Sequence, residues 1–432
     1  LKVNKLRDTA GSADAITLDP NGGAVLAGVT TMTTARVTSG IVTNTFIVGA
    51  GVTISESGIE ASGIGITVAN INGGQIGGRR NLMINGAMAV AQRGTSASSS
   101  GYQTVDRFYL NTDGVDEEPT QQQVSLDSSD TGPYETGFRK AWKITNGNQT
   151  GGAGSADNII IQYYIEAQDI ASSGWNYTSS SSYVTLSFWV KSSVAQNYFG
   201  RLMAIDGTQQ NYPFETGSLT ADTWTKITKT IPGNSNVQFD NDANRGLSVE
   251  FCMFRGTDKT GSVTLNQWAA YSSATRVPDM TSTWYTTNDA TIEFTGFQLE
   301  VGSQATAFER RSFGEELSLC QRYFFTVRGD SNHRTNIPAF ANSTTNCRAM
   351  VSFPTSMRAT PTFSGSSTNM VFDSSDDSAT FLCSALQQGG TMTNSDPHGM
   401  LIEVSTSSMT AGQGGVLEFR ADNGELNFSA DL

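Results

Sequence analysis

Alternation with a period of two is the feature of this sequence that most restricts its fold. In several segments apolar and polar residues alternate, or form a short apolar run, and Gly, Ser, Asn or Asp bounds each segment. Alternating side chains lie on opposite faces of a β-strand, so one face of each segment can be buried. We expect a two-sheet jelly roll of about eight or more strands over residues 81–311. The segments are ADNIIIQYYIEA (156–167), SSYVTLSFWVKSS (181–193), DTWTKITKTIP (222–232), GLSVEFCMFRG (246–256) and ATIEFTGFQLEVG (290–302).

The composition favours an all-β protein. Charged residues make up 16% of the 432 residues, against about 25% in a typical soluble domain. Ser, Thr, Asn and Gly fill the deficit, and these residues favour turns and strands over helix interiors. The net charge of −13 argues against a nucleic-acid partner, because phosphate binding depends on Lys and Arg. No apolar run approaches the ~20 residues of a membrane span, so we expect no membrane insertion.

Aromatic residues divide the chain near residue 80. Phe46 is the one aromatic residue before that position, and all the others follow it. The sequence GGQIGGRR (73–80) is therefore the expected joint between a thin N-terminal part and the globular domains. Residues 1–28 form a separate N-terminal segment in which the DPNGG motif predicts a strand–turn–strand unit.

An intertwined stalk is predicted for residues 29–80. This segment is rich in Thr, Ser, Gly, Ile and Val, and its β-branched residues favour an extended chain. One copy cannot bury these side chains within itself, whereas three copies wound round a common axis can, since Gly permits close backbone approach. We expect a homotrimeric β stalk; a disordered linker is the alternative. The expected core residues are Ile54, Ile59, Ile64, Ile66, Val68, Ile71 and Ile76.

Residues 312–325 carry a helical pattern and are expected to form a helix that connects two β-domains. Ser312 and Glu315 have the spacing of a capping box. An apolar stripe follows at helical spacing and comprises Phe313, Leu317, Cys320 and Phe324.

Residues 326–432 return to strand patterns and predict a second, smaller β-sandwich. Asp422-Asn423-Gly424 predicts a hairpin turn within it. The four cysteines of the chain stand far apart with no CxxC motif, so neither zinc nor a redox pair is indicated. We expect small buried apolar side chains, and disulfides are the alternative. The cysteines are Cys252, Cys320, Cys347 and Cys383.

Five motifs in the chain resemble those of a known class of viral protein. They are RRNLMINGAMAVAQRGTS (79–96), GYQTVDRFYL (101–110), FTGFQLEVGSQATAFERRSFGEELSLCQRYF (294–324), MRATPTF (357–363) and FSADL (428–432). Together they resemble tail fibre or receptor-binding proteins of tailed bacteriophages. Residues 81–311 also resemble jelly-roll carbohydrate-binding modules.

The resemblance implies a homotrimeric tail fibre located in the virion. Its N-terminal anchor, residues 1–28, would dock to tail or adaptor proteins of the phage. Its distal tip, residues 326–432, would point towards the host envelope. The matching motifs belong to the scaffold, so the resemblance carries over no binding residue.

Aromatic side chains in polar loops are the candidates for contact with a sugar. An exposed ring can lie against the C–H face of a pyranose while amides and carboxylates read its hydroxyls. The candidates are Trp175 and Tyr177 in SSGWNYTSSSS, and Trp284 and Tyr285 in TSTWYTTND. Packing of these rings at the loop–sheet rim or at a trimer interface is the alternative. Trp142, Trp189 and Trp224 lie in strand patterns and are expected in the core.

Catalytic and metal-binding motifs are sparse. The chain has two histidines and no GxSxG elbow, and its paired carboxylates lie in Ser- or Pro-flanked loops. Asp240, Asp242 and Asn244 begin a D-x-D-x-N pattern, but Arg245 replaces the Gly and Phe251 the Glu that an EF-hand requires. We expect no cofactor. Two interpretations of these three residues stay open: an ordinary acidic turn and a structural calcium ion.

The sequence therefore favours a non-enzymatic adhesin. Such a protein would attach the virion to a bacterial surface glycan or lipopolysaccharide, and several weak sites would add up through avidity. Two alternatives stay open. The first is a polysaccharide depolymerase tailspike with carboxylates paired in space, and the second is a purely structural fibre or adaptor segment.

Overall fold

The computed structural model describes residues 79–329, 336–367, 370–375, 380–388, 395–420 and 424–432, and the backbone of six strands before residue 79. The chain forms two compact units, Leu1–Val68 and Ala69–Leu432. The first contains two three-stranded antiparallel meanders. Strands β2 and β3 pair across the DPNGG motif, as predicted. The strands are β1 (Lys5–Arg7), β2 (Asp14–Leu18), β3 (Ala24–Leu26), β4 (Thr45–Val48), β5 (Val52–Ser55) and β6 (Gly58–Ala61).

Most of the predicted stalk lies outside the described residues. Ile54 in β5 is the cross-strand partner of Ile59 in β6, but the side chains of these two residues are not described. The shared trimer core therefore stays a prediction. The residues of that core that lie wholly outside the described part of the chain are Ile64, Ile66, Val68, Ile71 and Ile76.

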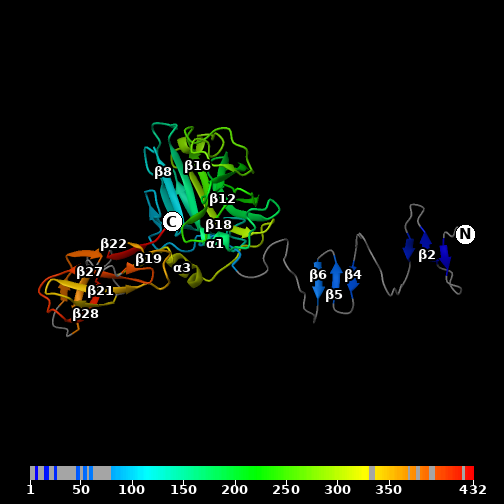
Figure 1. Ribbon diagram of the computed structural model, residues 1–432. Coiled ribbons are helices and arrows are strands. Elements are labelled where there is room, and N and C mark those ends of the chain that lie inside the picture. The colour runs from blue at the N-terminus through cyan, green and yellow to red at the C-terminus, as the bar shows by residue number, and fades with distance from the viewer. Residues whose placement is uncertain are drawn as a thin grey trace. The chain divides into compact units, whose positions relative to one another are not determined.

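The second unit contains a sandwich of two six-stranded antiparallel sheets (Figure 1). The first sheet has the order β15-β12-β18-β10-β9-β7 and the second has the order β17-β14-β13-β16-β11-β8. The five alternating segments of the sequence form β11, β12, β15, β16 and β18, which confirms the all-β jelly-roll prediction. The strands are β7 (Ser96–Ala97), β8 (Phe108–Asp113), β9 (Thr120–Ser125), β10 (Lys140–Thr145), β11 (Asn158–Glu166), β12 (Tyr183–Ser192), β13 (Asn197–Ala204), β14 (Gln210–Ser218), β15 (Thr225–Pro232), β16 (Arg245–Arg255), β17 (Ala269–Ala270) and β18 (Thr291–Val301).

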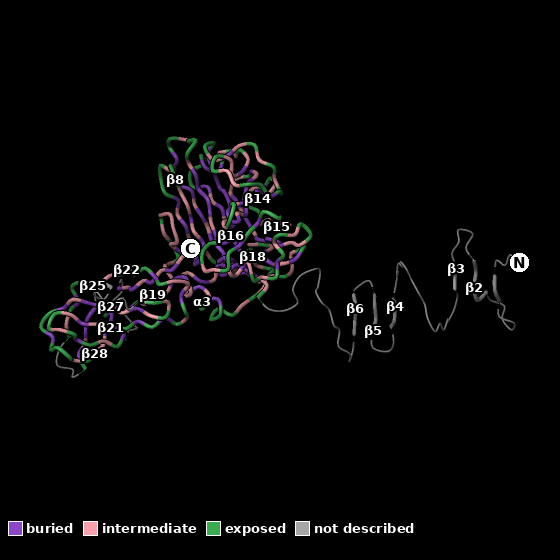
Figure 2. The backbone as a smooth tube through the Cα atoms, viewed as in Figure 1, coloured by how far each residue is buried: buried purple, intermediate pink, exposed green. Residues whose placement is uncertain are grey.

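Aromatic side chains fill the space between these two sheets. Phe188 of β12 stacks on Phe297 of β18 with ring centroids 4.7 Å apart, and Phe251 of β16 meets Phe294 edge-on at 4.9 Å. Trp142 of β10 is fully buried in the same core, as its strand pattern predicted. Figure 2 shows buried residues in purple along the strands of the sandwich. Two short helices, α1 (Ala167–Ala171) and α2 (Thr283–Thr286), lie in its loops.

The connecting helix α3 (Phe313–Gln321) begins with the predicted capping box between Ser312 and Glu315. It ends at Gln321 and not at residue 325, because Phe324 already pairs with Ser429 as the first residue of a strand. The predicted apolar stripe is wrong at its start. Phe313 is 62% exposed, and Glu316 is buried in the same helix.

The C-terminal domain is a sandwich of a three-stranded sheet, β19-β29-β22, and an eight-stranded sheet. One apolar core joins the two sheets, as predicted for this part of the chain. The predicted hairpin at residues 422–424 is wrong: β28 and β29 flank it but lie in different sheets, because β20 and β23 occupy both edges of β28. The strands are β19 (Phe324–Arg328), β20 (Ile337–Ala341), β21 (Asn346–Ser352), β22 (Thr362–Ser366), β23 (Met370–Ser374), β24 (Thr380–Leu382), β25 (Ala385–Gln388), β26 (Ser395–Asp396), β27 (Gly399–Ser405), β28 (Gly414–Phe419) and β29 (Glu425–Ser429).

A buried carboxylate joins the jelly roll to the segment after α3. Glu166, at the end of β11, has no exposed surface and accepts hydrogen bonds from Nε and Nη2 of Arg322 at 2.7 Å each. The Tyr323 hydroxyl donates to the same carboxylate. All four cysteines are buried and unpaired, as predicted. None of the helices in the described part of the chain is long and apolar enough to cross a membrane.

Candidate functional site

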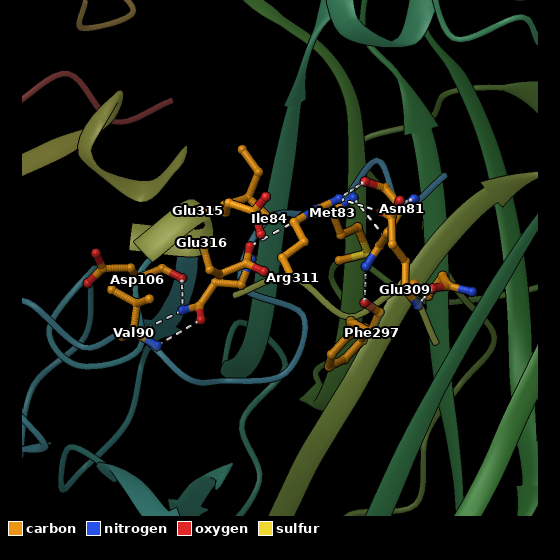
Figure 3. A network of polar contacts seen from close by, with 12 residues as sticks. Asn81, Met83, Ile84, Val90, Asp106, Phe297, Glu309, Arg311, Glu315 and Glu316 are labelled. Atoms are coloured by element: carbon orange, nitrogen blue, oxygen red, sulfur yellow. Dashed lines mark hydrogen bonds and ion pairs between the residues drawn. The ribbon is translucent and has the colours of Figure 1, made fainter. Parts of the chain in front are cut away.

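An asparagine network fixes the start of the jelly roll against its last strand (Figure 3). The Asn81 side chain donates through Nδ2 to the Phe297 carbonyl at 3.0 Å and accepts through Oδ1 from the Leu299 backbone N–H at 3.1 Å. The Asn85 side chain donates to the Val90 carbonyl and accepts from the Val90 N–H, at 2.8 and 2.9 Å. Both residues come from the NLMING stretch, so this motif is a scaffold element.

The same network holds the chain that leaves β18. Glu309 accepts hydrogen bonds from the backbone N–H groups of Arg80 and Asn81 at 3.0 and 2.9 Å, and it pairs with Arg311 at 2.8 Å. Burial is the largest influence on the Glu309 carboxyl and raises its pKa, but these donors together outweigh burial and lower the pKa below the usual value. A carboxylate held this firmly fixes the exit segment, residues 306–311.

Arg311 links the exit segment to α3. Its guanidinium donates to the Asn81 carbonyl at 2.6 Å and pairs with Glu316 at 3.3 Å. Glu316 also accepts the Asn85 backbone N–H at 2.5 Å, which explains why this acidic residue is the buried one in the helix. The exposed side chain of Arg310 lies between these anchored neighbours.

Two adjoining hollows lie where this segment crosses the outer face of the first sheet. Their volumes are about 180 and 250 Å³, and a wider third hollow of about 680 Å³ continues past Arg311. The first two share Phe138, Phe308 and Arg310. We call them the Arg310 groove. Its main lining residues are Thr136, Phe138, Arg139, Lys140, Ser187, Trp189, Lys226, Phe308, Arg310 and Arg311.

Aromatic rings line the floor of the Arg310 groove. Trp189 is half-buried on the outer face of β12, and Phe138 meets Phe308 edge-on with ring centroids 4.8 Å apart. Gly296 of β18 lets these rings approach the strand: a Cβ atom there would lie 2.7 Å from Phe138 and 3.2 Å from Trp189. Its φ of +70° also favours glycine. A hollow with an aromatic floor can receive the apolar face of a small ring.

Basic side chains stand beside this floor. The Arg310 guanidinium lies 4.8 Å from the Phe138 ring centroid and donates to the carbonyls of Gly137 and Thr136. Lys226 lines the Trp189 end and is exposed. Burial lowers the pKa of Arg310, and the charge of nearby Arg139 lowers it further. The groove thus combines ring faces, hydroxyl groups and positive charge.

The four rings proposed from the sequence lie elsewhere, and three of them have no open face. Trp175 is 3% exposed, and Trp284 and Tyr285 are 0% and 1% exposed. The indole N–H of each Trp donates to a backbone carbonyl at 3.2 Å, and the Tyr285 hydroxyl donates to Asp157 at 2.9 Å. Tyr177 is half-buried, and its ring packs edge-on against Phe239 at 4.9 Å. These rings pack at the loop–sheet rim, which was the alternative.

The predicted metal-binding residues lie in a loop that contacts other elements through its backbone. Asp242 accepts hydrogen bonds from the backbone N–H and the side-chain amide of Asn244 at 2.9 and 2.6 Å. Asp240 donates its backbone N–H to Asp206, and Arg358 of the C-terminal domain donates to the Ala243 carbonyl. Across the described ranges, no group of three or more His, Cys, Asp or Glu side chains is placed to hold a metal ion.

A structural calcium ion at Asp240, Asp242 and Asn244 stays a prediction. If calcium binds the folded chain at this loop, the melting temperature should rise with calcium concentration, because a ligand of the native state alone stabilises it. Thermal melts with calcium and with a chelator measure this. An unchanged melting temperature would contradict the calcium site and support the acidic turn.

No family model and no curated protein matches the chain. Among solved structures, it is similar to the enzymatically active domain of tailspike protein 4 of bacteriophage CBA120, at 8% identity over 51% of this chain and 21% of that one, with a TM-score of 0.27. It is similar to TmCBM61 in complex with β-1,4-galactotriose, at 10% identity over 52% and 99%, with a TM-score of 0.25. It is also similar to a family 11 carbohydrate-binding module of Clostridium thermocellum, at 11% identity over 49% and 98%, with a TM-score of 0.23. These values are too low to support a conclusion about ligand or activity.

Proposed function

We propose that this chain is a glycan-binding protein and that the Arg310 groove is its binding site. The observation that carries the proposal is the aromatic floor formed by Trp189 and Phe308, with Lys226 and Arg310 beside it. Stacking on ring faces combined with a few placed polar groups is the usual chemistry of sugar recognition. The two hollows adjoin each other at Phe138, Phe308 and Arg310, which suits successive sugar residues of a long polysaccharide better than a free small molecule.

More specifically, we propose a non-enzymatic tail fibre of a tailed bacteriophage that attaches the virion to a bacterial surface polysaccharide. The motif resemblance supports the tail fibre, and the composition of residues 29–80 supports a homotrimer docked through its N-terminal segment to tail or adaptor proteins. Two neighbouring carboxylates in one Pro-flanked loop accept hydrogen bonds from the backbone: Asp116 accepts the Gly151 N–H at 2.6 Å, and Glu117 accepts the Asn148 N–H at 2.7 Å. Such contacts suit structural carboxylates.

Replacement of Trp189 by Ala is expected to weaken polysaccharide binding strongly while the chain stays folded. Loss of a stacking ring removes about 0.5–1.5 kcal/mol of binding free energy in addition to the contribution of its buried area. Avidity multiplies this loss over several sites. Binding of purified chain to an array of bacterial surface polysaccharides measures the effect. Tyr271→Ala is the matched control, because this half-buried ring lies near Arg201 of the second sheet.

Three outcomes separate the proposal from its rivals. Binding that Trp189→Ala removes and Tyr271→Ala leaves supports the groove. Release of oligosaccharide from a bound polysaccharide would instead indicate a depolymerase. A chain that binds neither the array nor bacterial cells at micromolar concentration would indicate a structural fibre or adaptor segment.

A further inference from the structure

The charge of the Arg310 groove is opposite to that of the protein. The whole chain carries 27 basic and 40 acidic residues. The hollow at the Trp189 end, formed entirely by described residues, is lined by Lys226 and Arg310 and by no carboxylate. The adjoining hollow adds Arg139, Lys140 and Arg311, with Glu316 as its one acidic residue. A local reversal of sign on an acidic surface concentrates anionic ligands at that place.

Four of these basic residues have no carboxylate partner among the described residues. Arg310 and Arg139 donate to backbone carbonyls, and Lys140 donates to the Ser125 hydroxyl at 3.1 Å. Lys226 makes no ion pair with any described residue. The one acidic residue of the groove, Glu316, does not pair with these four residues, because it is buried and bound to Arg311 and to the Asn85 N–H.

Like charges are also held close together on aromatic rings in and beside the floor. Arg310 lies over Phe138 and Phe308, at 4.8 and 5.7 Å from their ring centroids, and Arg139 stacks on Tyr134 at 4.0 Å. Burial is the larger cause of the lowered pKa of Arg310, and the charge of Arg139 lowers it further. Repulsion between two guanidinium groups is unfavourable, and an anion between or beside them relieves it.

We propose that the Arg310 groove selects polysaccharides whose repeating unit carries an anionic group, a carboxylate or a phosphate. This inference rests on the proposed glycan-binding function and adds the ligand class. A pyranose ring lies on the floor of Trp189 and Phe308, and its anionic substituent meets Lys226 and Arg310. Each hollow is smaller than the roughly 300–1,000 Å³ of a typical ligand pocket, so each suits one sugar residue of a longer chain.

The test uses residues 1–432 and the surface polysaccharide that they bind in the array experiment. Three samples are compared: the native polysaccharide, the same polysaccharide with its carboxyl groups reduced to alcohols, and the same polysaccharide dephosphorylated with hydrofluoric acid. We expect one of the two neutralised samples to bind about 10–100-fold more weakly, the usual effect of losing a charge-assisted hydrogen bond. The sample that loses affinity distinguishes carboxylate from phosphate.

Matched variants test the residues. Lys226→Gln is expected to weaken binding of the native polysaccharide about tenfold and to leave binding of the neutralised sample unchanged. Lys143→Gln is the control, because Lys143 lies on the first sheet outside the groove lining. Raising the salt concentration should weaken polysaccharide binding by the wild-type protein more than binding by the Lys226→Gln variant, since salt screens exposed charges.

The outcomes keep the two proposals apart. If no surface polysaccharide binds, the glycan-binding function itself is wrong. If a polysaccharide binds and its neutralised samples bind equally well, the glycan-binding function stands and the selection for anionic polysaccharides is wrong. Equal losses for Lys226→Gln and Lys143→Gln would likewise contradict a role for the groove charges.

Discussion

Replacement of Glu250 by Gln is expected to lower the free energy of unfolding of the jelly roll by about 3–5 kcal/mol, the range for breaking a buried ion pair. Glu250 accepts from Nε and Nη2 of Arg201 at 2.7 Å each, and from Nη2 of Arg255 at 3.1 Å. All three side chains are at most 3% exposed. Gln carries no charge, so both guanidinium groups would stay buried without an anion.

Chemical denaturation of the purified chain measures this loss. Glu118→Gln is the matched control, because the Glu118 carboxylate is exposed and accepts a hydrogen bond from the Thr112 hydroxyl at 2.9 Å. We expect this control to change the free energy of unfolding by less than about 0.5 kcal/mol. A loss of similar size in both variants would contradict a special role for the buried pair.

The same carboxylate makes stability depend on pH. Burial alone would raise the pKa of Glu250, but the charges of Arg201 and Arg255 outweigh burial and lower it from 4.5 to about 2. Because the native pKa lies below the unfolded value, this contribution is complete above pH 4.5 and is lost as the pH falls towards 2. The difference in stability between wild type and Glu250→Gln should therefore shrink over this window. A constant difference would show that Glu250 is not ionised in the native state.

Period-two alternation predicted the jelly roll because its strands place their apolar faces in one core. It did not predict that the opposite face of β16 is buried too. Glu250 lies at an outward position of that strand, where the sequence indicates a solvated residue. Segment 256–283 covers this face instead, and Val277 packs there against Cys252. Contacts between a strand and a loop that is distant in the sequence cannot be predicted from a local sequence pattern.

The Arg310 groove could be predicted only in part. Trp189 stands between Ser187 and Lys191, so strict alternation places it on the polar, outward face of β12; the expectation of a core position overlooked this signal. Gly296 inside a strand was a second signal, since such a glycine often marks a close approach. The contact of Phe138 with Phe308 joins residues far apart in the chain, and no local sequence pattern predicts it.

The aromatic residues in polar loops were wrongly expected to be exposed, again because the sequence shows only local neighbours. Trp175 and Trp284 lie among Ser, Thr and Asn residues, which made them look exposed. Their indole N–H groups find backbone carbonyls inside the fold, so burial leaves no donor unsatisfied. A polar neighbourhood in the sequence therefore does not determine whether an aromatic residue with a polar atom is buried.

Replacement of Gly296 by Ala is expected to damage both stability and binding, because this residue shapes the floor of the groove. Its φ of +70° costs an alanine about 1–2 kcal/mol. The new Cβ would lie 2.7 Å from Phe138 and 3.2 Å from Trp189, and displacing these packed rings adds about 1–3 kcal/mol. Chemical denaturation and the polysaccharide array measure the two effects.

Gly217→Ala separates backbone strain from displacement of the rings. Gly217 of β14 has a φ of +77°, but apart from its chain neighbours no atom lies within 4 Å of the place that a Cβ would take, so alanine there meets backbone strain alone. We expect this control to lose about 1–2 kcal/mol and to keep full polysaccharide binding. If Gly296→Ala bound as well as Gly217→Ala, the rings of the floor would not be ligand contacts. If only Gly296→Ala lost polysaccharide binding, Gly296 would determine the shape of the proposed site, although its FTGF motif is a scaffold motif in the sequence.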